Sequence, residues 1–161
     1  MLHEARILFD HSRHTLNVRG VEAPLDVLAF EGEEALSQPF TYRIEFTSTH
    51  LDLPADTFLL KDASFSLRAP PEQLGIPGYT PPIAAPLRTL YGTITRFALL
   101  AFSRDESRYE VTFVPRLTLL GLARQYRIYQ NQSVPEIVEQ VLRRNDFAGQ
   151  DFLFQLTREY P

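Results

Sequence analysis

Histidine is the residue type in this 161-residue sequence most able to bind a metal or transfer a proton, and it occurs at positions 3, 11, 14 and 50. His11 and His14 are three residues apart, a spacing that places two metal ligands on one face of a helix. The residues around them indicate a turn between two strands, where this spacing does not bring two imidazoles together. We therefore interpret both as surface turn residues and predict no metal site.

Carboxylates form the second candidate group, because Glu31, Glu33 and Glu34 lie close together around Gly32. Such a cluster can act as an acid–base pair or hold a cation. Glutamates beside a glycine are more typical of a solvated turn, and we favour that interpretation. It also applies to a predicted hairpin tip whose charges neutralise one another, formed by Arg104, Asp105, Glu106 and Arg108.

Motifs for catalysis and cofactor binding are missing from the sequence. It contains no cysteine, and it has no G-x-S-x-G, H-E-x-x-H, Walker or dinucleotide-binding pattern. We therefore predict that the protein is not an enzyme, with no catalytic, cofactor-binding or metal-binding residues and no cofactor. The stretch PPIAAP at 81–86 has the spacing of a polyproline ligand, but a spacer loop is the favoured interpretation.

Composition is that of a soluble globular protein, with 44% hydrophobic and 22% charged residues. The formal net charge of -4 argues against a nucleic-acid partner, which requires a concentrated basic surface. The start, MLHEARILFD, resembles neither a secretory signal nor a transit peptide. The apolar run FALLAF at 97–102 is far too short to cross a bilayer, so we predict no membrane insertion.

Strand patterns dominate the first 115 residues. In PFTYRIEFTST (39–49) apolar residues alternate with polar ones, which predicts a half-buried strand. LYGTITRFALLAF (90–102) and RYEVTFVP (108–115) flank a polar turn and predict a hairpin. Pro54 is placed to open a helical turn with Phe58 and Leu59 facing inward. Further strands are predicted at 6–10, 15–20, 25–34 and 63–69, and a long proline-rich surface loop at 70–86.

The character of the sequence changes after Pro115. Residues 116–125 are interrupted by glycine, so no helix is predicted there, while RIYQ at 127–130 and residues 151–161 have strand patterns. The strongest helix signal is SVPEIVEQVLRRN at 133–145, where Ser133 and Glu136 have the spacing of a capping box. The chain ends without a turn or cap, so we expect it to be a truncated part of a longer protein.

These patterns predict a mainly β fold with minor α content (α+β), built on a closed or nearly closed β-barrel. Four segments occur in an order and at distances that resemble the N-terminal hub region of VgrG, the spike protein of type VI secretion. They are QPFTYRIEF (38–46), LYGTITRF (90–97), YEVTFVPRLTLL (109–120) and RIYQNQSVPEIVEQVL (127–142). The strand-to-helix segment at 127–142 is the most specific of the four.

The resemblance implies a hub similar to that of a bacteriophage baseplate. Residues 1–118 would form the first hub β-barrel, and 119–161 an incomplete strand–helix–strand start of the next hub domain. The implied partners are two further copies in a full-length homotrimer, the hexameric Hcp tube ring and baseplate components, with effectors unknown. The protein would adapt the spike to the tube, assembling in the bacterial cytoplasm and then being translocated without a signal peptide.

Two alternative functions remain open. The first is a tail hub protein of a contractile phage or a phage-like particle, which would share the same fold and physical role. The second, more distant alternative is a β module that binds glycans or effectors, for which the 70–86 loop would be the contact surface.

Overall fold

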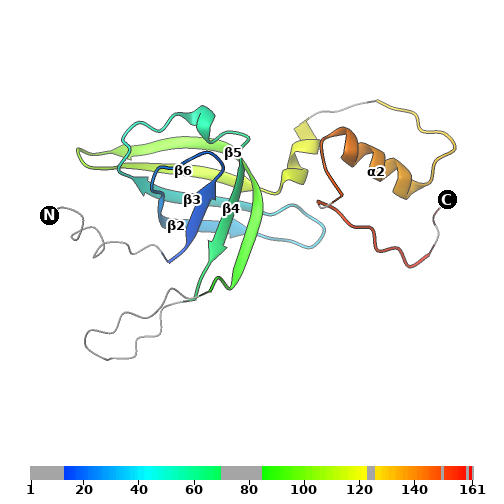
Figure 1. The fold of residues 1–161 in the computed structure, drawn as a ribbon, viewed down its shortest axis with the longest axis horizontal. Coiled ribbons are helices and arrows are strands. Elements are labelled where there is room, and N and C mark those ends of the chain that lie inside the picture. Colours follow the sequence, from blue (N-terminus) through cyan, green and yellow to red (C-terminus); the bar gives the residue numbers. More distant parts are fainter. Residues whose placement is uncertain (1–12, 70–84, 123–125, 150, 159, 161) are drawn as a thin grey trace. The chain divides into compact units, whose positions relative to one another are not determined.

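The computed structural model describes residues 13–69, 85–122, 126–149, 151–158 and 160 (Figure 1). The predicted strand at 6–10 and most of the predicted loop at 70–86 lie outside these ranges. The chain divides into two compact units, Met1–Thr118 and Leu119–Pro161. The assignment of these two units to successive hub domains stays a prediction.

A closed antiparallel barrel makes up the first unit, with its strands in the order β1-β2-β3-β6-β5-β4. This arrangement confirms the mainly β, barrel-containing fold predicted from the sequence. The strands are β1 (Thr15–Val18), β2 (Asp26–Glu33), β3 (Thr41–Ser48), β4 (Asp62–Leu67), β5 (Arg88–Phe102) and β6 (Ser107–Val114).

Buried and exposed side chains alternate along β3, which explains why this segment forms part of the barrel wall. Tyr42, Ile44 and Phe46 are buried, while Arg43 between them is exposed. Their partners on β6 continue the same inner face, since Ile44 lies opposite Val111 and Phe46 lies opposite Tyr109. A period of two therefore separates an apolar interior from a polar exterior.

Aromatic side chains fill one end of the barrel interior. Phe46 stacks on Tyr109 with ring centroids 5.5 Å apart, Tyr109 on Phe97 at 5.2 Å, and Phe97 on Phe58 at 4.6 Å. The Tyr109 hydroxyl accepts a hydrogen bond from the Leu53 amide at 3.1 Å and so ties the connection after β3 to this stack. The barrel is therefore a packed core.

A short 3₁₀ helix, η1 (Ala55–Thr57), follows Pro54, and the predicted helical turn is thus present. Phe58 is completely buried as expected, but Leu59 is 38% exposed, so its predicted inward orientation is wrong. The chain reverses at Leu60, which has a φ of 59° and donates its amide to the Ile94 carbonyl at 2.8 Å.

The predicted helix after Ser133 is confirmed as α2 (Val134–Arg144). Ser133 and Glu136 form a capping box, in which the Glu136 carboxylate accepts the Ser133 amide at 2.7 Å and the Ser133 hydroxyl at 2.9 Å. A 3₁₀ helix, η2 (Arg116–Leu122), occupies a stretch for which no helix was predicted. No helix in the described part of the chain is long and apolar enough to span a bilayer.

Two predicted strands of the second unit are wrong. Residues 127–130 are in no strand, and neither are the described residues from 151 onward. A strand forms only where a neighbour completes its ladder of backbone hydrogen bonds, and the described residues offer these segments no such neighbour.

Candidate functional site

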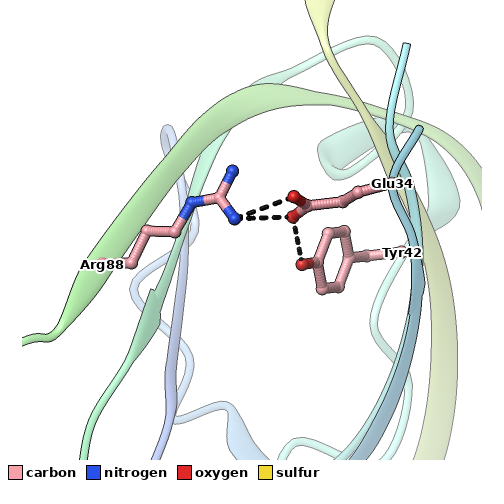
Figure 2. A network of polar contacts seen from close by, with 3 residues as sticks. All are labelled: Glu34, Tyr42 and Arg88. Atoms are coloured by element: carbon pink, nitrogen blue, oxygen red, sulfur yellow. Dashed lines mark hydrogen bonds and ion pairs between the residues drawn. The ribbon is translucent and has the colours of Figure 1, made fainter. Parts of the chain in front are cut away.

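Glu34, Tyr42 and Arg88 form a polar network that joins three parts of the barrel (Figure 2). Glu34 follows β2, Tyr42 is in β3, and Arg88 begins β5. Arg88 Nη1 donates to Glu34 Oε1 at 2.8 Å and to Oε2 at 2.9 Å, while the Tyr42 hydroxyl donates to Oε1 at 2.6 Å. Figure 2 shows both donors pointing at the one carboxylate.

The electrostatics of this network fix its protonation state. The hydrogen bond from Tyr42, followed by that from Arg88, holds the pKa of Glu34 below its ordinary value. Burial, followed by the hydrogen bond to Glu34, raises the pKa of Tyr42 to about 12. Neither group titrates near neutral pH, so the network is suited to holding strands together rather than to proton transfer.

The absence of a side chain at Gly32 on β2 allows the Tyr42 ring to lie in this position. The Tyr42 ring lies over Gly32, its partner on β2, and a Cβ at Gly32 would be 2.3 Å from the ring. Sequence reasoning missed the network, although glycine opposite an aromatic residue in a hairpin is a recognisable signal. Arg88 lies 54 residues from Glu34 and carries no such signal.

The histidine candidates do not come together in the described structure. His11 lies outside the described residues, as does His3. The His14 ring packs edge-on against Phe30 with centroids 5.0 Å apart, and its Nδ1 accepts the Arg68 amide at 3.3 Å. Burial, followed by the charges of Arg13 and Arg68, lowers the pKa of His14. Within the described ranges no three acidic or histidine side chains are grouped so as to hold a metal ion.

The glutamate candidates also separate into different contacts. Glu31 pairs with Arg43 at 2.6 Å across the β2–β3 hairpin, whereas Glu34 belongs to the network with Arg88. Glu33 is exposed at the end of β2. Arg108, predicted to be neutralised within its own hairpin tip, instead pairs with Glu45 on β3. These contacts stabilise neighbouring strands and do not converge on one point.

An apolar hairpin end is the clearest candidate contact surface on the barrel. Leu99, Leu100 and Phe102 are 52%, 45% and 80% exposed on the distal part of β5. β4 pairs with β5 only as far as Thr93, so β5 and β6 continue beyond β4, as the hairpin at the left of Figure 1 shows. The run FALLAF is the sequence signal for this surface. In a strand, alternate side chains point to opposite faces, so only about half of a continuous apolar run can face the core and the rest must be exposed.

A polar groove lies within the second unit, between residues 127–132 and α2. It has a volume of about 520 Å³. Its lining is made of Arg127, Ile128, Tyr129, Gln130, Gln132, Gln140 and Arg144. The lining contains arginine and amide side chains and no carboxylate.

Comparisons with known proteins find similarity to phage tail hub and type VI secretion spike proteins. Residues 33–161 match the family described as phage tail baseplate hub (GPD). The chain is 31% identical over 147 residues to the type VI secretion system spike protein VgrG5 of Pseudomonas aeruginosa, covering 91% of this chain and 17% of that protein. It is 34% identical over 154 residues to VgrG1c of the same organism, covering 92% of this chain and 19% of the relative.

A solved structure adds a match in three dimensions. The E. coli c3393 protein is described as a component of the type VI secretion system with structural similarity to the T4 bacteriophage tail proteins gp27 and gp5. It superimposes with a TM-score of 0.77 at 47% sequence identity, covering 91% of this chain and 37% of that chain. The chain thus spans less than a fifth of the length of these two spike relatives.

Proposed function

Since the chain belongs to the phage tail baseplate hub (GPD) family, we propose that it is a structural part of a type VI secretion hub that joins the spike to the hexameric tube. The observation that carries this proposal is the match to the E. coli type VI secretion component, at 47% identity and a TM-score of 0.77. The aromatic core and the inter-strand ion pairs support it, because they suit a rigid part that transmits force between larger assemblies.

The proposal assigns the two units to successive hub domains. Residues 1–118 form the first barrel, and 119–161 are the beginning of the next domain. Exposed apolar side chains in the second unit support this, since Ile128, Leu153 and Val134 are 89%, 81% and 57% exposed. A complete domain buries such residues, so further structure is expected to cover them.

The partners in the proposal are those of a spike hub. The full-length protein forms a homotrimer, contacts the Hcp tube ring and the baseplate, and carries effectors of unspecified type. It has no nucleic-acid partner, no membrane insertion and no enzymatic activity of its own. It assembles in the bacterial cytoplasm and is then translocated by the secretion machinery. A tail hub of a phage-like particle is the second candidate, favoured by the family match itself.

Export of the tube protein tests this function in the organism that makes the full-length protein. Deleting the full-length gene is expected to abolish release of Hcp into the medium, because a tube without its hub does not assemble. Complementation with Glu33→Gln, His11→Ala or His14→Ala is expected to restore release to the wild-type level. These three residues are the best catalytic or metal candidates in the sequence.

Two results would contradict the proposal. Normal Hcp release from cells that lack the gene would show that this protein is not needed as a hub. Loss of release in any of the three variants, with an unchanged melting curve, would instead indicate chemistry at that residue. The phage alternative predicts that release of particles, rather than of Hcp, depends on the gene.

A further inference from the structure

We propose that the N-terminal segment of this chain, residues 6–12, docks as an added strand along the open edge of β2, at residues 28–33. The inference concerns the first unit alone and does not rest on the proposed hub function. Three observations on the described barrel carry it: an unpaired strand edge, an incompletely covered aromatic ring, and the direction in which the chain enters β1.

The edge of β2 is open because β1 covers only its first residue. β1 pairs with β4 along its whole length, from Thr15 to Val18, but with β2 only where Thr15 lies opposite Asp26. On its other side β2 pairs with β3 as far as Glu33. In an antiparallel sheet alternate residues direct their backbone groups to opposite sides, so every second residue of 28–33 directs them away from β3. No residue in the described ranges pairs with them there.

The side chains along this edge are incompletely covered. The centre of the Phe30 ring lies 5.0 Å from that of His14, 5.2 Å from that of Phe65 and 6.1 Å from that of Tyr42. Despite these contacts Phe30 remains 39% exposed, and Leu28 is 51% exposed. An open strand edge with apolar side chains is prone to pair with another strand, and proteins commonly cover it.

The course of the chain leads the N-terminal segment to this edge. β1 runs antiparallel to β2 from the pair Thr15 and Asp26, so the residues before Thr15 continue beside the residues after Asp26. His14 already follows this course, because its ring packs edge-on against Phe30. Residues 6–12 are long enough to run along residues 28–33, since paired strands have nearly the same rise per residue.

The sequence of the segment suits an added strand. It contains the consecutive apolar residues Ile7, Leu8 and Phe9. Because successive side chains of a strand point to opposite faces, at least one of them would point to the same face as Phe30. Docking would therefore complete the backbone hydrogen bonds of β2 and cover its apolar side chains, which is a common mode of binding for extended segments.

Hydrogen exchange followed by NMR tests the proposal on the 161-residue protein. The amides of residues 28–33 that face away from β3 are expected to be protected. Combining Leu8→Pro with Phe9→Pro is expected to raise their exchange rates by about tenfold or more. Neighbouring residues of a strand direct their amides to opposite sides, so one of the two prolines must remove a hydrogen bond to β2.

Two controls accompany this variant. Leu2→Pro combined with His3→Pro changes two positions before the segment and is expected to leave the exchange rates of residues 28–33 within about twofold of the wild type. The Val111 amide on β6 reports whether the barrel is folded, because β6 pairs with both β3 and β5. It is expected to stay protected in both variants and in a chain that lacks residues 1–12, in which the β2 edge should again exchange rapidly.

Three results would overturn the proposal. Rapid exchange of the edge amides in the wild type would show that nothing covers β2. Protection that persists without residues 1–12 would assign the edge to another occupant, and a dependence on protein concentration would identify that occupant as a second copy. Loss of Val111 protection in both altered chains would show that the segment is needed to form the barrel, and does not dock on a barrel already formed.

Discussion

At the scale of single residues, the Tyr42 hydroxyl is the contact whose removal is most informative. It donates at 2.6 Å to Glu34, while its ring is almost fully buried. Tyr42→Phe keeps the ring and removes only this donor, so we expect the free energy of unfolding to fall by about 1 kcal/mol. Urea denaturation measures the change. Tyr91→Phe is the control, because Tyr91 is 75% exposed and its hydroxyl has no hydrogen bond to a described residue.

Acid should weaken the same contact. The pKa of Glu34 is lowered in the folded protein, so its ionised form is favoured by folding. The resulting stability is present above the ordinary carboxyl pKa of 4.5 and is lost as pH falls through the lowered value. The difference between wild type and Tyr42→Phe should therefore shrink in acid. A difference that grew on acidification would show that Tyr42 does not act through the Glu34 carboxylate.

At the scale of secondary-structure elements, Gly92 determines how closely β5 approaches β6. A Cβ at this position would lie 2.2 Å from the Val114 carbonyl oxygen, and a backbone atom in a paired strand cannot move aside. We expect Gly92→Ala to destabilise the barrel by about 2 kcal/mol, seen as a lower melting temperature. Gly121→Ala is the control, since a Cβ there meets nothing within 4 Å. If Gly92→Ala and Gly121→Ala had equal melting temperatures, β5 and β6 would be able to move apart at little cost in free energy.

The cap of α2 gives a second prediction for an element. Ser133→Ala removes the hydroxyl from the capping box and should destabilise the helix by about 1 kcal/mol. Urea denaturation followed by helical circular dichroism detects it. Gln132→Ala, one residue before the cap, should leave the midpoint unchanged. If Ser133→Ala behaved like Gln132→Ala, the helix would not depend on this cap.

Local signals explain which elements could be predicted from the sequence. Alternation in β3 and the capping box of α2 are encoded within about ten residues, and both were predicted correctly. Residues 127–130 have an equally good strand pattern but form no strand, because a strand depends on a distant neighbour. The Arg88–Glu34 pair was missed for the same reason, as its register arises only when the barrel closes.

At the scale of the whole molecule, the exposed surfaces bear on the oligomeric state of this chain. A stable interface buries about 800 Å² on each partner, which requires about 20 residues on each side. The apolar hairpin end offers Leu99, Leu100 and Phe102, and their neighbours at the tip, Arg104 and Asp105, are charged. By itself this surface is too small to hold copies together. In the proposed full-length trimer, contacts outside these 161 residues would supply most of the association energy.

We therefore expect the 161-residue chain to be mainly monomeric at micromolar concentration. Light scattering after gel filtration should give a mass near 18.5 kDa. A stable trimer, with three times that mass, would contradict this expectation and show that the hub region assembles unaided. In that case Phe102→Ser tests the hairpin, because Phe102 is 80% exposed and its replacement leaves the core intact. Dissociation by Phe102→Ser would place the trimer contact on the apolar hairpin end, and an unchanged mass would place it elsewhere.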